Sequence, residues 1–287
     1  MNVLIVHGGA GKWQDQALAR ARAGIPAALR CGYETLKRTG SALQAVMAAV
    51  RQMEDDPIFN CGKGSQMTIN GEIQMDAAVM TSDGRFGAVG ALEAVQHPID
   101  VAYKVMTETS HLLIVGEGAK KLARFWGFPR FNPMTEKARR RLAELRRRGR
   151  SSFMPEFEDY LALDTVGAVA RDRYGRFAVA NSTGGYAGKL PGRIGDTPIF
   201  GAGTWACPHG AATGTGLGEE LIRRFLSKTV CDLMRKHSAQ KAVDISLEGT
   251  KRVGMIAIDR QGNIGLGHTT RAMPWGWVRN GEEKSGS

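Results

Sequence analysis

The sequence of 287 residues contains no uninterrupted apolar run of the roughly 18–20 residues that a membrane-spanning helix requires. Residues 1–6 lack the basic flank and the apolar length of a signal peptide, and they are typical of a short buried strand. Only four cysteines occur, widely scattered and without a Cys-x-x-Cys pair, which argues against a disulfide framework or a cysteine zinc site. We therefore expect a cytoplasmic protein that has no membrane partner.

Several catalytic motifs are absent as well. Residues 8–13 imitate a phosphate-binding loop but lack its spacing and its hydroxyl, and residues 214–218 lack the full dinucleotide-binding spacing. No Gly-x-Ser-x-Gly elbow occurs, and the six histidines show no metal-ligand spacing. Nucleotide binding and α/β-hydrolase chemistry are therefore not indicated, whereas a cysteine–histidine nucleophile stays open.

The formal net charge is +11, but most of the chain has only a small excess of basic residues. Residues 137–150 hold eight basic groups and one acidic group, so this segment carries +7 of the excess. A nucleic-acid site normally spreads basic groups over a folded face with aromatic residues among them. We interpret residues from about 133 to 158 as a basic, mobile linker or frayed helix, and we do not expect a nucleic-acid partner.

Short apolar runs and helical periodicities alternate on both sides of this basic segment. Before it, the pattern predicts strands at residues 3–6, 72–80, 86–92 and 111–115, and helices at 15–38, 42–54 and 118–125. Pro26 should kink or break the first helix. After it, the pattern predicts hairpins of strands 166–170 with 176–181 and 254–258 with 263–266, and a helix at 218–234. This grouping favours an α+β fold built on antiparallel sheets.

Glycine is concentrated between residues 184 and 218, where it makes up 11 of 35 residues, against 37 of 287 overall. The residues between these glycines include Arg193, Asp196 and the rigid Pro191 and Pro198, which are unusual in a flexible linker. Glycine allows backbone to approach a small ligand closely, because no side chain blocks the way. We therefore expect a ligand-binding loop here.

Three threonines lie beside glycine or at a strand edge, namely Thr165, Thr183 and Thr215. Threonine is a weak nucleophile unless a base lies next to it. If the peptide bond before such a threonine is cut, its own α-amine supplies that base, with an ordinary pKa of about 8. The basic segment ends just upstream of Thr165, so a cut at that position is sterically permissible.

Seven collinear stretches make the sequence resemble the plant-type asparaginase/isoaspartyl peptidase family of N-terminal threonine hydrolases. They are Val6–Gly11, Glu54–Ser65, Met75–Met80, Asp164–Val169, Ser182–Gly185, Lys189–Asp196 and Thr215–Glu219. The resemblance extends from about residue 3 to residue 278, and only the basic segment has no counterpart. Any one stretch is weak evidence, but seven in the same order are specific.

The resemblance implies a four-layer αββα sandwich of the N-terminal-nucleophile hydrolase type, made as an inactive precursor. It also implies self-cleavage between Asp164 and Thr165, which would divide one folded domain into an α chain of residues 1–164 and a β chain of residues 165–287. Two such αβ units associate in the family, so we expect a dimer of αβ units. The family's chemistry uses no cofactor.

The resemblance also implies a role for each matching position. Thr165 is the nucleophile, Thr183 orients it, and the Thr215 hydroxyl with the Gly216 N–H forms the oxyanion hole. Substrate binding falls to Arg193 for the α-carboxylate, and to Asp196 and the Gly218 carbonyl for the α-ammonium; Gly216 borders the same pocket. An Arg/Asp pair suits a zwitterionic amino acid, because a guanidinium can bind a carboxylate through two hydrogen bonds.

Residues 53–63 correspond to a loop that binds sodium through main-chain carbonyls in the family. The implied carbonyl donors belong to Met53, Glu54, Asp56, Phe59, Cys61 and Lys63. Asn60, in the same loop, is expected to position the nucleophile or its water. We thus expect a structural sodium ion at most.

The implied activity is hydrolysis of L-asparagine and β-aspartyl dipeptides through an acyl-enzyme on Thr165. Asp164 is the residue that glycosylasparaginases also have before the nucleophile, so hydrolysis of glycosyl-asparagine stays an alternative. Against it, Gly184 and Gly185 follow Thr183 where glycosylasparaginases tend to have Asn-Gly. A non-catalytic nucleic-acid binder that uses the basic segment is the alternative from another functional class.

Overall fold

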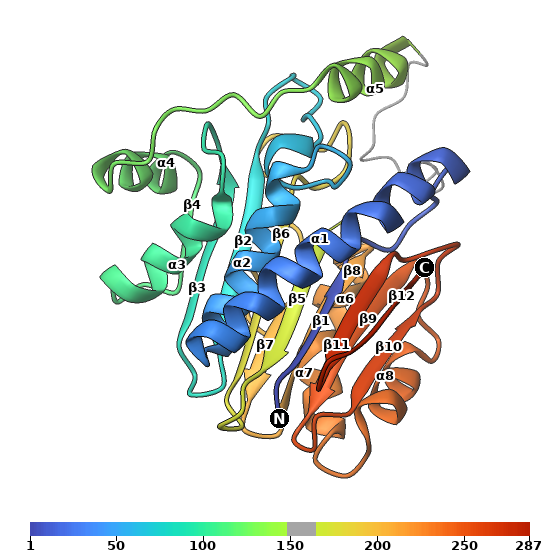
Figure 1. The fold of residues 1–287 in the computed structure, drawn as a ribbon. Helices are drawn as coiled ribbons and strands as arrows, with labels where there is room; N and C mark the ends of the chain where they lie inside the picture. The colour runs from blue at the N-terminus through green and yellow to red at the C-terminus, as the bar shows by residue number, and fades with distance from the viewer. Residues whose placement is uncertain (148–164) are drawn as a thin grey trace.

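Two β-sheets of unequal size form the centre of the structure, a computed structural model that describes residues 1–147 and 165–287 (Figure 1). The larger sheet has eight strands in the order β12-β11-β1-β5-β6-β2-β3-β4, and the smaller has four in the order β10-β9-β8-β7. The larger sheet contains β1 (Val3–His7), β2 (Met75–Thr81), β3 (Phe86–Leu92), β4 (Leu113–Val115), β5 (Val166–Arg171), β6 (Phe177–Thr183), β11 (Trp275–Arg279) and β12 (Glu282–Gly286). The smaller contains β7 (Thr204–Cys207), β8 (Gly210–Gly216), β9 (Val253–Asp259) and β10 (Ile264–His268).

The middle strands of the larger sheet are buried because their sequences are continuous apolar runs. Every residue of β1, β2, β3 and β6 is buried, as expected of strands covered on both faces. Neighbouring strands are antiparallel except for the parallel pair β3 and β4. The register of β1 with β5 sets His7 opposite Gly167, which brings the N-terminal segment beside the start of β5.

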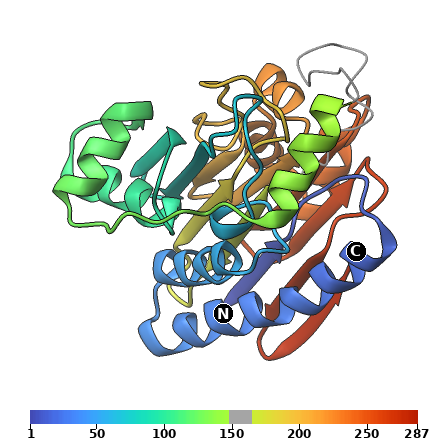
Figure 2. The same ribbon diagram turned by 90° about the horizontal axis from the view of Figure 1, so that it is seen from above.

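Helices pack against each sheet on the side away from the other (Figures 1 and 2). The helices on the larger sheet are α1 (Asp15–Thr39), α2 (Ala42–Asp55), α3 (Pro98–Glu108) and α4 (Gly116–Phe125). Those on the smaller sheet are α6 (Gly218–Arg224), α7 (Leu226–Leu233) and α8 (Ala239–Leu247). The two sheets meet through β1, β5 and β6 on one side and β8 and β9 on the other, and Ile5, Val169 and Ile256 belong to the core between them. The prediction of a mixed α and β fold on mainly antiparallel sheets is confirmed.

Of the kink or break predicted at Pro26, the break does not occur, and the prediction of a single helix at 218–234 was wrong. Pro26 lies inside α1 without breaking it, since the helix runs unbroken to Thr39, where Gly40 ends it in the left-handed conformation. Residues 218–234 form α6 and α7 rather than one helix, because Phe225 has a φ of +47° between them. A residue in the left-handed conformation cannot continue a right-handed helix, and the sequence around Phe225 gives no sign of this break.

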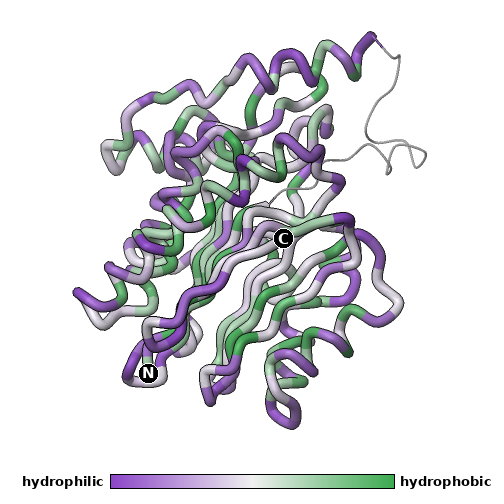
Figure 3. The backbone as a smooth tube through the Cα atoms, turned by 45° about the vertical axis from the view of Figure 1, so that its right-hand side comes forward, coloured by the Kyte–Doolittle hydropathy of each residue, from purple (hydrophilic) through white to green (hydrophobic). Residues whose placement is uncertain are grey.

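The basic segment contains a packed helix, α5 (Glu136–Arg147), so of the predicted linker or frayed helix these residues form a helix. Ala138, Leu142 and Leu145 are buried on one face of α5. The Arg146 guanidinium donates to the Ile69 carbonyl at 2.6 Å, which ties the end of α5 to the turn before β2. Polar and apolar positions alternate along α5 (Figure 3), and the many arginines hide this apolar period in the sequence. Residues 148–158 of the predicted linker lie outside the described part.

Strand predictions in the larger sheet agree with β1, β3, β5 and β6 to within one or two residues, and β9 pairs with β10 as predicted. The predicted strand at 72–80 begins later, at Met75. Sequence reasoning missed α3, α8, the hairpin of β7 and β8, and the final hairpin of β11 and β12. None of the helices in the described residues is long and apolar enough to cross a membrane.

Candidate active site

The three candidate threonines come together where the two sheets face each other. Thr165 immediately precedes β5 and is buried, Thr183 ends the neighbouring β6, and Thr215 lies in β8 of the smaller sheet. The Thr215 hydroxyl donates to the Thr165 carbonyl oxygen at 3.2 Å. Three residues that are far apart in the sequence thus reach one site because the two sheets pack face to face. The other side of the predicted cleavage bond, Asp164, lies outside the described residues.

The N-terminal segment holds the Thr215 hydroxyl in place. The Ala10 N–H donates to Thr215 Oγ1 at 3.2 Å, so this oxygen accepts one hydrogen bond and donates another. A hydroxyl fixed in this way keeps one orientation, and its single proton must turn from the Thr165 carbonyl before it can be donated to an oxyanion. Sequence reasoning quoted Val6–Gly11 but gave Ala10 no role, because a main-chain donor leaves no side-chain signature.

Asn60 positions the turn that follows β6 rather than touching the nucleophile. Its amide donates to the Gly185 carbonyl, and its Oδ1 accepts the Gln66 N–H at 3.0 Å. Thr183 Oγ1 accepts the Gly185 N–H at 3.0 Å, which closes the same turn from the other side. Asn60 and Thr183 together therefore set the backbone of Gly185, which lines the pocket.

Arg193 is held by two neighbours that sequence reasoning missed. Its Nη2 and Nε lie 2.8 and 3.1 Å from Glu219 Oε1, and its guanidinium lies 4.5 Å from the ring centroid of Tyr186. Burial disfavours the charged guanidinium, but Glu219 and Tyr186 outweigh that cost and raise the pKa of Arg193. Arg193 is therefore a fixed cation in the pocket. Glu219 was the last residue of a quoted stretch, and its position in the first turn of α6 gave no sign of this partner.

Asp196 lies in a tight space between two glycines. A Cβ on Gly203 would meet Asp196 Oδ2 at 2.6 Å, and a Cβ on Gly218 would meet Oδ1 at 2.8 Å, so both positions require glycine. Oδ2 is buried and accepts no hydrogen bond from the described residues. Burial raises the pKa of Asp196 to about 7, although the nearby Arg193 acts in the opposite direction. Such a carboxylate is prepared to accept a cationic group from a ligand.

Behind the pocket lie two buried groups of opposite charge. The Asp76 carboxylate accepts the N–H groups of Ala91 at 2.9 Å and Gly195 at 3.1 Å, which ties the loop that carries Arg193 and Asp196 to β2. The Lys189 ammonium is fully buried and donates to the Gln74 carbonyl at 2.7 Å. Burial lowers the pKa of Lys189 to about 8, while the negative Asp76 raises it in part. These groups brace the glycine-rich loop from below.

His7 lies beside Thr165 at the edge of the site. Its side chain is fully buried, and burial lowers its pKa to about 3, with a backbone hydrogen bond to Thr165 as a smaller opposing effect. The imidazole is therefore neutral at physiological pH.

The loop after α2 brings main-chain carbonyls close to one another. Cβ atoms on Gly62 and Gly64 would collide with the carbonyl oxygens of Glu54 and Phe59, so only glycine leaves this cradle open. The Glu54 carboxylate accepts a hydrogen bond from the Ser182 hydroxyl at 2.6 Å, so we do not expect this carboxylate to be a metal ligand. Among the described residues, no group of three or more His, Cys, Asp or Glu side chains could hold a metal. The sodium loop implied by the resemblance, with main-chain carbonyl donors, stays a prediction.

A small pocket unites most of the candidate site residues. It is lined by the residues Thr165, Thr183, Gly185, Tyr186, Arg193, Gly195, Asp196 and Gly216. Thr215 and Gly218 adjoin it through Thr165 and Asp196, whereas Asn60 acts from behind through Gly185. A hydroxyl, a guanidinium and a carboxylate thus face one space, an arrangement that can hold a small zwitterion next to a nucleophile.

Comparison with known proteins gives a consistent result over the whole chain. A family-wide sequence model described as asparaginase matches residues 1–286. The plant-type L-asparaginase of Pyrococcus abyssi is 41% identical to the chain, with 98% of the chain and 97% of that protein covered. The plant-type L-asparaginase of Thermococcus kodakarensis is 39% identical, with 99% and 98% covered. The isoaspartyl peptidase/L-asparaginase of Bos taurus is 37% identical, with 99% and 95% covered.

Proposed function

The chain belongs to the asparaginase family, and on that basis we propose that it hydrolyses L-asparagine and β-aspartyl dipeptides through an acyl-enzyme on Thr165. The observation that carries the proposal is the convergence of Thr165, Arg193 and Asp196 on one pocket. Relatives that bear these two activities in their names match nearly the full length of the chain, which supports the same chemistry here.

The substrate is anchored by its α-amino and α-carboxyl groups. Arg193, kept in place by Glu219, binds the carboxylate through its planar guanidinium. Asp196 accepts the α-ammonium, which supplies the partner that its buried Oδ2 lacks. The side-chain amide is then directed toward the Thr165 hydroxyl.

Catalysis proceeds by acyl transfer. The Thr165 oxygen attacks the side-chain carbonyl carbon, and the α-amine of Thr165 accepts the hydroxyl proton and passes it to the leaving nitrogen. The carbon–nitrogen bond breaks and releases ammonia from asparagine or, from a β-aspartyl dipeptide, the second amino acid with a free α-amino group. Water then attacks the ester, releases aspartate and restores the hydroxyl. The Thr215 hydroxyl and the Gly216 N–H stabilise the negative oxygen in both halves of the reaction.

The free α-amine arises from self-cleavage of the precursor. The Thr165 hydroxyl attacks the carbonyl carbon of Asp164, the peptide bond becomes an ester, and water hydrolyses that ester to give the α and β chains. The hydrogen bond from the Thr215 hydroxyl to the carbonyl of Thr165 itself places Thr215 beside the nucleophile, which supports a role in this step. Thr183 orients the nucleophile in the mature enzyme.

The proposal includes the assembly around this site. Helices on the outer side of both sheets support a four-layer αββα sandwich. The carbonyls of Met53, Glu54, Asp56, Phe59, Cys61 and Lys63 would hold a structural sodium ion, and the glycine cradle of that loop supports this assignment. We further propose a dimer of αβ units, and the cytoplasm as the location of the protein.

Denaturing electrophoresis with intact mass measurement tests the maturation step. We expect two fragments, with the second beginning at Thr165. A chain that stays whole after long incubation, with no hydrolase activity, would contradict the proposal. Nucleic-acid binding that is lost on deletion of residues 137–150 would then favour the non-catalytic alternative.

Turnover on three substrates tests the specificity. We expect the matured enzyme to release ammonia from L-asparagine and leucine from β-Asp-Leu. If it hydrolyses glycosyl-asparagine and leaves both of these intact, the glycosylasparaginase alternative is correct.

A further inference from the structure

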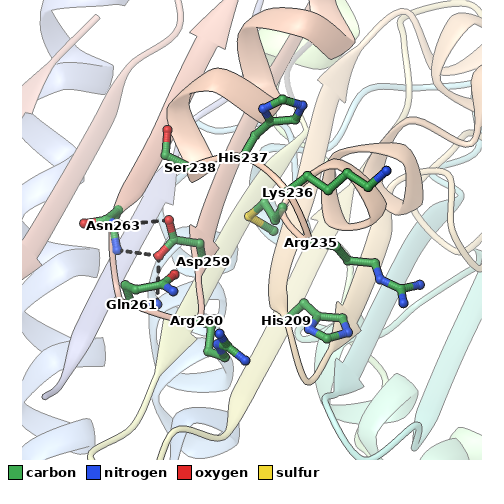
Figure 4. A pocket seen from close by; sticks show the side chains of 10 residues that line it. His209, Arg235, Lys236, His237, Ser238, Asp259, Arg260, Gln261 and Asn263 are labelled. Carbon is green, nitrogen blue, oxygen red and sulfur yellow. Dashed lines mark hydrogen bonds between the residues drawn. The ribbon is translucent and has the colours of Figure 1, made fainter.

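A second cavity lies at the far end of the smaller sheet, and it shares no lining residue with the Thr165 pocket. Its volume is about 520 Å³, within the range of small-molecule sites. Three connections meet around it, namely the turn between β7 and β8, the loop between α7 and α8, and the turn between β9 and β10 (Figure 4). The proposed hydrolysis makes no use of this cavity.

Positive charge gathers around this cavity without acidic partners. Arg235 and Lys236 come from the loop between the helices, and Arg260 comes from the turn between β9 and β10. None of these three side chains forms an ion pair with any residue that the structure describes, whereas Lys228 and Arg224, in and before the adjacent α7, are paired with acidic residues four positions away. These three cations, on two neighbouring connections, produce a positive local potential because no acidic side chain in the described part of the chain compensates their charge.

Further hydrogen-bond donors complete the lining. His209 comes from the turn between β7 and β8, and His237 and Ser238 follow Lys236. An imidazole has at least one N–H donor whether it is neutral or charged, so both histidines suit an anion in either state. Figure 4 shows these side chains around the same space as Arg235 and Arg260.

The single acidic side chain in the lining is already satisfied. Asp259 Oδ1 accepts the N–H groups of Gln261 at 3.0 Å and Asn263 at 2.9 Å. Oδ2 accepts the Ala239 N–H at 3.1 Å and the Asn263 side-chain amide at 3.0 Å. The carboxylate is buried, and its four hydrogen bonds hold the β9–β10 turn against the start of α8. It therefore shapes the cavity and does not offer a free site for a cation.

We propose that this cavity binds the diphosphate group of a small anion. Three permanent cations exceed what a single carboxylate requires, while two linked phosphates can contact several cations at once. The lining contains no Phe, Tyr or Trp side chain, so it lacks the large aromatic ring on which a base would stack best. The phosphates, rather than a nucleobase, are the recognised group, and the source is either inorganic diphosphate or a nucleoside diphosphate.

Isothermal titration of the full-length protein tests this site directly. Inorganic diphosphate, a nucleoside diphosphate and a single-stranded oligonucleotide are titrated separately at low and at moderate salt. We expect both diphosphates to bind and to weaken as salt rises, as binding through several charges should. Equal affinity would assign recognition to the phosphates alone, and tighter binding of the nucleotide would identify it as the source; either result supports the site.

A matched pair of variants locates the binding. Arg235→Gln, Lys236→Gln and Arg260→Gln together should weaken diphosphate binding by at least about tenfold, since each removes a charge-assisted hydrogen bond. Arg20→Gln, Arg22→Gln and Arg38→Gln together remove the same charge from exposed positions of α1 and should leave it within about twofold. All six positions are exposed, so both proteins should fold, and thermal unfolding checks this.

The proposal fails if neither diphosphate binds, or if the cavity variant and the α1 variant weaken binding equally. It also fails if the oligonucleotide alone binds and the cavity variant abolishes that binding. Hydrolysis of asparagine is measured in parallel. Because the cavity residues lie outside the Thr165 pocket, failure of one proposal leaves the other unaffected.

Discussion

The Thr165 pocket and the cavity at the end of the smaller sheet both present cations to a ligand, but they hold those cations differently. Arg193 is mostly buried, with 15% of its side chain exposed, and is fixed by Glu219 and Tyr186. Arg235, at the second cavity, is exposed and has no ion-pair partner among the described residues. Fixed, desolvated charge suits a reaction that requires one orientation, whereas exposed charge attracts an anion without a strict geometry.

The largest difference between the two regions should appear when the nucleophile is removed. Thr165→Ala should leave the precursor whole and lower hydrolysis by at least about 10³-fold, because no other hydroxyl can replace it. Thr165→Ser should retain cleavage and part of the activity, and Thr107→Ala, on an exposed helix face, should match the parent. Intact mass and ammonia release measure both effects. Full activity of Thr165→Ala would contradict the proposed role of Thr165 as the nucleophile. Diphosphate binding at the second cavity should be the same in all of these variants.

Replacement of Asp196 should separate function from stability. The pKa of Asp196 is raised to about 7 in the folded protein, against about 4 when unfolded, so the folded state binds the extra proton between these pH values. The free energy of unfolding should therefore fall as the pH rises from 4 to 7. Asp196→Asn should lose about 10²-fold in kcat/KM but unfold at a higher temperature than the parent at pH 8.

The pH dependence of kcat/KM in the parent protein should also reflect the titration of Asp196. Below pH 7 the protonated Asp196 no longer attracts the α-ammonium, and kcat/KM should fall about tenfold per pH unit. Protonation of the Thr165 α-amine lowers kcat/KM in both proteins, so Asp196→Asn should keep that fall and lack only the further fall due to Asp196. Thermal unfolding and initial rates from pH 4 to 8 provide the data, and an identical pH profile in both proteins would exclude Asp196 as the titrating group.

Arg193→Lys should lower kcat/KM for asparagine by about 10–100-fold, because an ammonium cannot form the planar double contact of a guanidinium. Arg223→Lys, on the exposed side of α6, makes the same chemical change and should have no effect. Steady-state kinetics compare the two variants. At the second cavity, Arg235→Lys should preserve most of the diphosphate binding, since charge rather than geometry dominates there. Equal sensitivity at both sites would contradict the comparison.

Asn60→Ala should lower kcat by about tenfold with little change in KM, because it frees the turn at Gly185 without touching the substrate anchors. Asn132→Ala removes a cap from an exposed turn and is the matched control. Progress curves at saturating and limiting asparagine separate the two constants. A change confined to KM would assign Asn60 to substrate binding.

The smallest effect should follow from the triple substitution at Arg235, Lys236 and Arg260. Hydrolysis of asparagine should change by less than about twofold, because surface charges at this distance are screened by salt. The measurement is made with and without diphosphate. A larger loss would show that the two regions communicate.

The sequence predicted those elements of the fold that have a clear local pattern of apolar and turn residues. The continuous apolar runs of β1 and β3 can only be buried strands, and β5 and β6 are joined by a recognisable turn. The hairpin of β7 and β8 is rich in glycine and alanine, and β12 is polar, so neither has a clear period. The apolar face of α5 consists of three residues among many arginines, and charge dominates the pattern.

The site divides in the same way. Thr165, Arg193 and Asp196 have side chains whose chemistry can be read, and the resemblance supplied their roles. Ala10 acts through its main chain, and Glu219 acts through a pairing that depends on where α6 begins. Such contacts are properties of the packed sheets, and no spacing in the sequence encodes them.

The strand order of the larger sheet has a consequence for the product of self-cleavage. A cut before Thr165 would place β1 on one fragment and both of its neighbours, β5 and β11, on the other. β6 would likewise stay paired with β2 of the opposite fragment. Strands of the two fragments therefore alternate in one sheet, and separating the fragments would break the hydrogen bonds along both edges of β1. The severed enzyme should therefore migrate as one body under native conditions and come apart only when it unfolds.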